Sequence, residues 1–417
     1  MLKAFIKRHF WSILIVFFVC LNLFLAQSFF DLEVFNFNDR KMDSISFNQD
    51  LDSFRNKNFK TFKDVSGYFT KLAEDKGAVY AYELLKIAPI PTNMDLHLLG
   101  HTIGEVLYKQ EGAKGIYKCT QDFRNACSHT IVVGLLFEKG EQALDEMVDI
   151  CKNAPGGSGA YTMCFHGLGH GVLAYNDYNL EKTVKMCVGL KTLDGYSGRE
   201  ISECIGGSIM EIISGGFHDK DAWEKQKLKY FSKDDPLMPC SSGFMPEEGK
   251  SVCYTYLTPH LFQSAGADLN RPSPKTFGKA FNFCNKIPVK DVGSRMACYG
   301  GFGKEFIVLA KNRDIRNMNN FTQEELSKVH EWCNLSENKD GVEFCTNSAV
   351  SSLFWGGEND PQVSVDFCSL APDTLRQSCF QALMGNAFQY LKSKDTLSNF
   401  CKMLKEPYKK ECSQRLN

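Results

Sequence analysis

The feature that most constrains the fold of this chain is a row of paired cysteines. The sequence of 417 residues contains 17 cysteines, and all except Cys20 fall into consecutive pairs. The two cysteines of a pair lie 8 to 17 positions apart, and the first cysteine advances by 32 to 53 positions from one pair to the next. An even number at regular spacing predicts disulfide bonds, whereas zinc clusters need C-x-x-C spacings that this sequence lacks. The predicted pairs are Cys119/Cys127, Cys151/Cys164, Cys187/Cys204, Cys240/Cys253, Cys284/Cys298, Cys333/Cys345, Cys368/Cys379 and Cys401/Cys412.

The residues around each pair predict a helical hairpin. Stretches such as EQALDEMVDIC and TQEELSKVHEWC, which end at the first cysteine, have apolar residues three and four positions apart, as an amphipathic helix does. Turn-forming residues lie between the cysteines, as in CKNAPGGSGAYTMC, and a second helix is expected to begin before the second cysteine. An aromatic residue directly follows the second cysteine in four pairs and is expected to pack in the core: Phe165, Tyr254, Tyr299 and Phe380.

Hairpins that repeat at this interval stack into an α-solenoid. We therefore expect an all-α fold of about eight or nine hairpins, each stapled by a disulfide that contributes on the order of 3 kcal/mol. This architecture is similar to Sel1-like and tetratricopeptide-type (TPR) repeats, although the repeat lengths vary here and neither consensus is matched.

The N-terminal part of the chain predicts a membrane anchor. Three basic residues precede an apolar run from Phe10 to Phe30, which predicts one transmembrane helix with a cytoplasmic N-terminus. A signal peptide cleaved near Ala26 is the alternative. In both cases the chain from about residue 31 lies in the periplasm, at the cell surface or in a lumen, where disulfides form. The expected organisation is a cytoplasmic tail (1–9), a signal anchor (10–30), a stalk or linker (31–65) and an extracytoplasmic repeat domain (66–417).

Five of the nine histidines recur at two equivalent positions in neighbouring repeats. His129 and His166 each follow a second cysteine by two positions, and His97 takes the same place if Asp95 stands for the cysteine. In two of these repeats another histidine follows four positions later, on the same helical face. The candidate ligands are His97, His101, His129, His166 and His170, with Glu105 continuing the first face.

A row of imidazoles with at most one carboxylate suits Zn²⁺ or copper better than a carboxylate-rich di-iron site. Two imidazoles one helical turn apart can share a metal ion, and a neighbouring helix can complete the site. Alternatively, the histidines are packing residues that bind backbone carbonyls where helices cross. Glycines such as Gly167 and Gly169 then allow neighbouring hairpins to approach closely.

Other polar positions also recur. A basic residue lies three positions before the second cysteine in five pairs, which favours a solvated first turn over an anion-binding row. Glu211 and Glu305 each follow a second cysteine by seven positions and are expected to be exposed, with a polar lining of the histidine surface as the alternative. The basic residues are Arg124, Lys250, Arg295, Arg376 and Lys409.

Two functional hypotheses follow. The net charge of −1 argues against nucleic-acid binding, and the motifs H-E-x-x-H, G-x-S-x-G and Walker A are absent. The first hypothesis is a membrane-anchored scaffold whose concave surface binds a protein, peptide or glycan and whose histidines form a metal or ligand site. The second is a Zn- or Cu-dependent enzyme or metal carrier that uses the same histidines.

Overall fold

The computed structural model describes residues 44–91, 94–192, 198–215, 219–231, 234–269, 271–357, 359–391 and 393–416. Every regular element in these ranges is a helix, which confirms the all-α prediction. The chain divides into two units between Asn58 and Phe59, and the described part of the first unit contains α2 (Ser44–Arg55). The apolar segment 10–30 lies outside the described residues, and no helix within them is both long and apolar enough to cross a membrane. The predicted domain boundaries stay predictions.

The larger unit consists mainly of helix pairs. The first helices of the pairs are α4 (Ala78–Ile87), α7 (Leu144–Lys152), α9 (Leu180–Gly189), α14 (Pro274–Cys284), α16 (Gln323–Cys333), α18 (Pro361–Leu370) and α20 (Lys394–Met403). The matching second helices are α5 (Leu96–Glu111), α8 (Gly157–Tyr175), α10 (Arg199–Ser214), α15 (Val292–Ala310), α17 (Lys339–Phe354), α19 (Asp373–Tyr390) and α21 (Tyr408–Arg415). There are two further second helices in the described residues. α6 (Asp122–Lys139) follows a 3₁₀ segment, η1 (Gly112–Lys118), and α12 (Glu247–Tyr256) follows a series of turns. The first helix expected before Cys119 and before Cys240 is therefore not formed as an α-helix.

The remaining elements connect the pairs. They are α3 (Phe62–Lys76), α11 (Lys220–Tyr230), α13 (Thr258–Ser264) and the 3₁₀ segments η2 (Gly140–Ala143), η3 (Leu190–Thr192), η4 (Ile315–Asn317) and η5 (Trp355–Gly357). The helical region 62–87 is divided into α3 and α4 at Gly77, whose φ of 100° is unfavourable for residues with a side chain.

Eight disulfides staple these units, as the sequence predicts. The bonds are Cys119–Cys127, Cys151–Cys164, Cys187–Cys204, Cys240–Cys253, Cys284–Cys298, Cys333–Cys345, Cys368–Cys379 and Cys401–Cys412. Most of them join the end of a first helix to the first half of its second helix. Because disulfides persist in oxidising compartments, they indicate an extracytoplasmic environment.

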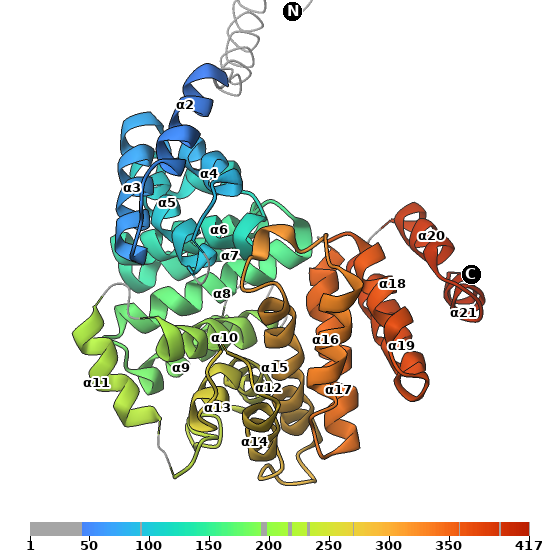
Figure 1. Ribbon diagram of the computed structural model, residues 1–417. Coiled ribbons are helices and arrows are strands. Elements are labelled where there is room, and N and C mark those ends of the chain that lie inside the picture. The colour runs from blue at the N-terminus through green and yellow to red at the C-terminus, as the bar shows by residue number, and fades with distance from the viewer. Residues whose placement is uncertain are drawn as a thin grey trace, which may run out of the picture. The chain divides into compact units, whose positions relative to one another are not determined.

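The second helices pack against one another in chain order. α5 contacts α6, α6 contacts α8, and the row continues through α10, α12, α15 and α17 to α19. Figure 1 shows this progression from the blue helices through green and yellow to red. Late and early segments of the chain also meet: Arg316 in η4 donates a hydrogen bond of 2.5 Å to the carbonyl of Ala88, 228 residues earlier, and η4 and η5 contact α6 and α8. Residues far apart in the sequence therefore surround one interior space.

The core lies between each first helix and its second helix, and between successive second helices. The four aromatic residues that follow second cysteines are at most 4% exposed, which confirms their predicted packing role: Phe165, Tyr254, Tyr299 and Phe380. All sixteen bonded cysteines are buried with them. Burial of aromatic side chains supplies much of the apolar stabilisation of such a core.

The glycines of α8 are explained by close helix packing. A Cβ atom at Gly167 would lie 2.5 Å from the Cα atom of His129, and one at Gly169 would overlap the carbonyl of Cys204. Each interior glycine costs a helix about 1 kcal/mol relative to alanine. Here the absence of side chains at Gly167 and Gly169 allows α6 and α10 to approach the backbone of α8 from two sides. This close packing brings the histidines of α6 and α8 together.

Candidate metal centre

The first two histidines are positioned by the start of α5. Asp95 is the N-cap of this helix, and its carboxylate accepts a hydrogen bond of 3.1 Å from the backbone N–H of Leu98. Such a cap fixes where the helix begins. It thereby places His97 in the first turn and His101 one turn later on the same face.

The start of α6 is strained, and the strain orients His97. Three consecutive non-glycine residues have left-handed backbone angles, with φ of 53° at Phe123, 57° at Arg124 and 62° at Asn125. Each such residue costs roughly 1–2 kcal/mol, and strain of this kind is concentrated at functional sites. The turn directs the carbonyl of Phe123 toward His97, whose Nδ1–H donates a hydrogen bond of 2.6 Å to it.

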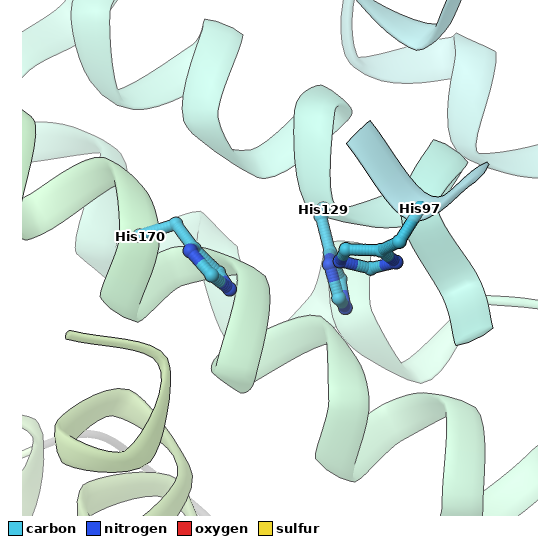
Figure 2. A group of neighbouring side chains, drawn as sticks. All are labelled: His97, His129 and His170. Atoms are coloured by element: carbon cyan, nitrogen blue, oxygen red, sulfur yellow. The ribbon is translucent and has the colours of Figure 1, made fainter. Parts of the chain in front are cut away.

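All five histidines converge between α5, α6 and α8. The neighbouring ring centroids are 4.5 Å apart for His97 and His101, 5.1 Å for His97 and His129, 5.7 Å for His129 and His166, 5.8 Å for His129 and His170, and 5.1 Å for His166 and His170. Figure 2 shows three of the side chains extending from three different helices into the space between them. The equivalent repeat positions predicted from the sequence therefore form one cluster.

His97, His129 and His170 form a buried group that can hold a metal ion. One ring nitrogen of each lies within 4.8 Å of the corresponding nitrogens of the other two. Nε2 is buried and has no hydrogen-bond partner in all three residues. Because buried polar atoms normally have partners, three such atoms in one place require an explanation.

The other ring nitrogen of each residue is already bound, as expected for metal ligands. His97 Nδ1 donates to a backbone carbonyl, and His170 Nδ1 donates to the Glu211 carboxylate at 3.0 Å. His129 Nδ1 lies 3.3 Å from Nε2 of His101. A proton on Nδ1 leaves the Nε2 lone pair free, and such outer partners orient histidine ligands in metal sites. The hydrogen bonds therefore leave Nε2 as the available ligand atom in His97 and His170.

Burial lowers the pKa of two of these imidazoles. It lowers the pKa of His97 to about 4, and it holds the pKa of His129 well below its usual value, with a further contribution from the neighbouring histidines. Metal ions bind the neutral imidazole, so protons do not compete for the nitrogens of His97 and His129 near neutral pH.

The remaining predicted ligands have other surroundings. His101 contacts His129 as its hydrogen-bonding neighbour, and His166 lies beside the Tyr256 ring with centroids 4.7 Å apart. Glu105 forms no hydrogen bond or ion pair with any of the five histidines in the described part of the chain, and burial raises the pKa of its carboxyl. Within the described residues it does not belong to the metal-competent group.

Two glutamates of α10 belong to the site. The expectation that Glu211 is exposed is wrong, because its side chain is 7% exposed and binds His170. The sequence did not indicate Glu203 as a site residue. Its Oε2 lies 3.3 Å from Nδ1 of His166. Neither atom has a hydrogen-bond partner, so the two groups are close but not aligned for a hydrogen bond. Burial raises the pKa of Glu203 to about 7. The packing of α10 on α8 brings both carboxyls to the histidines. No local sequence motif predicts this packing.

A cavity of about 360 Å³ adjoins the histidines. His97, His129 and His166 form part of its wall, and other parts come from the later helices α10, α12 and α15 and from the segments around η4 and η5. Arg124 also lines this cavity. The expectation of a solvated first-turn residue is therefore wrong for Arg124, although it suits Lys250, which pairs with Glu247 near the surface.

The donor set fits Zn²⁺ or copper. Zinc binds imidazole nitrogen at about 2.0–2.1 Å, so tetrahedral nitrogen ligands lie about 3.3 Å apart. The three imidazoles therefore need to move together by up to about 1.5 Å to bind one ion. Rotation of the rings about their side-chain bonds is the smallest change that would supply such a movement.

No protein-family model, curated protein or solved structure matches this chain. The assignment of the site therefore depends on the geometry of its residues.

Proposed function

We propose that this chain is an extracytoplasmic metalloprotein that binds one Zn²⁺ or copper ion at His97, His129 and His170 and acts on a small molecule in the adjoining cavity. The single observation that carries the proposal is the convergence of three buried histidines, each of which has a buried Nε2 atom without a hydrogen-bond partner. Imidazole nitrogen is a preferred ligand of both metals.

The proposed architecture is an α-solenoid similar to Sel1-like and TPR arrays, anchored by the apolar segment 10–30. The packing of second helices in chain order supports the solenoid. The anchor is supported by the sequence of residues 10–30. Together they would hold the metal site outside the cytosol.

A reactive metal suits this site better than a structural one. Structural zinc sites use four protein ligands, whereas catalytic sites keep a position open. Here three histidines form the metal-competent group beside a cavity, and eight disulfides already staple the fold. A bound metal ion would supply Lewis-acid chemistry, by polarising an oxygen of a bound molecule or of water.

An enzyme or ligand-binding protein is favoured over a metal carrier. All three ligand residues are buried, and a carrier must release its metal to a partner. The cavity volume of about 360 Å³ lies near the lower end of the range for small-molecule sites. Binding of a protein, peptide or glycan, the first hypothesis from the sequence, stays a prediction for the surface of the array.

Metal analysis of the purified full chain with its disulfides intact tests the proposal. We expect about one Zn²⁺ or copper ion per chain, and we expect His129→Ala to lose it. The matched control is His330→Ala, because His330 is also buried but binds the carbonyl of Phe367 in another part of the fold. The proposal is wrong if the native chain binds neither metal at micromolar concentration, or if His129→Ala binds metal as the native chain does.

A further inference from the structure

The cavity beside the histidines contains a cationic side chain that forms no ion pair in the described part of the chain, although the charges of Glu305 and Asp95 act on it. Arg124 lines it, and Nη2 of this guanidinium is buried without a hydrogen-bond partner. No carboxylate in the described residues lies within ion-pair distance of Arg124. The face of the guanidinium stacks on Trp355, with 4.5 Å from Cζ to the ring centroid. A guanidinium withdrawn from water normally has an anionic partner, because its desolvation is otherwise uncompensated.

The neighbouring cations differ from Arg124 in this respect. A second pocket of about 240 Å³ shares Arg124 and Trp355 with the cavity and also contains Lys86 and Arg316. Lys86 lies 2.8 Å from the Asp122 carboxylate, and Arg316 lies 2.9 Å from the Asp314 carboxylate. Lys86 and Arg316 thus have carboxylate partners, whereas Arg124 and Arg313, which line the cavity, form no ion pair with a described residue.

The cavity as a whole carries an excess of positive charge. Its wall contains the cationic side chains Arg124, Lys304 and Arg313 and the carboxylates Asp95 and Glu305. Lys304 lies 2.7 Å from Glu305. Burial would raise the pKa of Glu305, but the charges of Lys304, Arg124 and Arg313 outweigh it and lower the pKa. Glu305 is thus already engaged by Lys304, whereas Asp95 accepts a hydrogen bond at the start of α5.

Backbone strain is concentrated at the same place. Eight non-glycine residues of the described ranges have positive φ, and three of them line the cavity: Arg124 at 57°, Arg313 at 65° and Trp355 at 44°. These residues come from three separate segments of the chain. Strain of this kind persists where the surrounding structure holds a residue in place for a function.

The rest of the wall is largely apolar. It includes Met163, Met210, Ile213, Leu269 and Val308. A site with an apolar wall and a few fixed polar groups is typical of small-molecule binding, in which the polar groups set the orientation of the ligand. The cavity therefore has a cationic part, an apolar part and a part formed by histidines.

We propose that the cavity binds a small organic anion, whose carboxylate or phosphate group is held by Arg124 and Arg313 and whose hydrocarbon part contacts the apolar wall. This inference rests on the proposed function for the role of the metal, and it names the class of molecule on which the site acts. The Phe123 carbonyl orients His97, and Arg124 is the next residue. The same left-handed turn therefore fixes both the anion-binding group and a metal ligand.

Three probes with the same six-carbon chain test this proposal: hexanoate, hexyl phosphate and hexanol. Their binding to the full chain is measured by isothermal titration calorimetry, with and without bound Zn²⁺. The metal-free chain isolates the cationic residues, because carboxylate and phosphate also coordinate Zn²⁺. We expect both anions to bind roughly 10-fold or more tightly than hexanol, since hydrogen bonds to charged groups contribute that much.

Arg124→Met is expected to remove this preference, because it keeps the chain length and deletes the charge. Arg271→Met is the matched control, because the side chain of Arg271 is 89% exposed and lies outside the cavity lining. Arg313→Met, expected to weaken anion binding several-fold, decides the result if Arg124→Met does not fold. The proposal is overturned if the anions bind no more tightly than hexanol, or if the folded variant keeps the native preference.

Metal content is measured on the same samples and separates this proposal from the proposed function. A chain that binds the anions through Arg124 but binds no metal supports the anion site and contradicts the metal site. A chain that binds metal at the histidines but shows no preference for the anions supports the metal site and contradicts the anion site.

Discussion

Replacing Glu211 by glutamine is expected to weaken metal binding about 10-fold while all three ligands remain. The Glu211 carboxylate accepts a hydrogen bond of 3.0 Å from His170 Nδ1, and both side chains are 7% exposed. The carboxylate fixes the tautomer that leaves Nε2 free, and its negative charge increases the basicity of the imidazole. Glutamine keeps the shape and can still accept this hydrogen bond through its carbonyl oxygen, but it lacks the charge.

The size of the expected loss of metal affinity follows from the loss of the negative charge at position 211. Changes to the outer partners of metal ligands typically reduce affinity 10- to 100-fold, and retention of a neutral hydrogen bond places Glu211→Gln at the lower end. A 10-fold loss corresponds to about 1.4 kcal/mol of binding free energy. His170→Ala deletes the ligand itself and is expected to have a larger effect.

Competition between the full chain and a chromophoric zinc chelator at pH 7.5 measures these affinities. Glu248→Gln is the matched control, because Glu248 forms an exposed ion pair with Lys191 at the surface. We expect Glu248→Gln to bind zinc as the native chain does. Native affinity in Glu211→Gln, or an equal loss in both variants, would refute the assignment of Glu211 as the residue that orients His170.

Three further predictions concern stability, measured by urea unfolding of the metal-free full chain. Gly169→Ala is expected to destabilise by about 1–3 kcal/mol, since its Cβ overlaps a neighbouring helix, whereas Gly385→Ala, with open space around its Cβ, should be neutral or stabilising; equal effects would contradict the packing. Replacing both Cys151 and Cys164 by serine should cost on the order of 3 kcal/mol, and an unchanged transition would contradict the staple. Because the folded pKa of His97 is about 4, the unfolded state binds more protons between about pH 6.5 and 4. The free energy of unfolding should therefore fall with acidification, by about 1.4 kcal/mol per pH unit for each such histidine; a constant value from pH 7.5 to 5 would contradict this.

The repeats could be predicted because their determinants are local. The spacing of Cys151 and Cys164, the turn residues between them and the apolar periodicity before them all lie within one unit. The histidine row could also be predicted, because His129 and His166 occupy the same place relative to a second cysteine. Equivalent positions on neighbouring second helices lie side by side, whatever the details of each hairpin.

The rest of the site depends on contacts that no local pattern specifies. Glu203 and Glu211 approach the histidines only because α10 packs closely on α8. The left-handed turn at Arg124 has no sequence signature, since non-glycine residues rarely adopt it. Arg316 and Ala88, which are in contact across the cavity side of the row, are 228 residues apart in the sequence.

X-ray absorption at the zinc edge, on the full chain loaded with one equivalent of Zn²⁺, tests the central claim most directly. We predict a tetrahedral site with histidine nitrogens and one further light atom at about 2.0–2.1 Å, and a loss of the histidine scattering in His129→Ala. An ion surrounded only by oxygen atoms, sulfur ligands at about 2.3 Å, or a spectrum unchanged by His129→Ala would contradict the assignment of His97, His129 and His170 as the ligands.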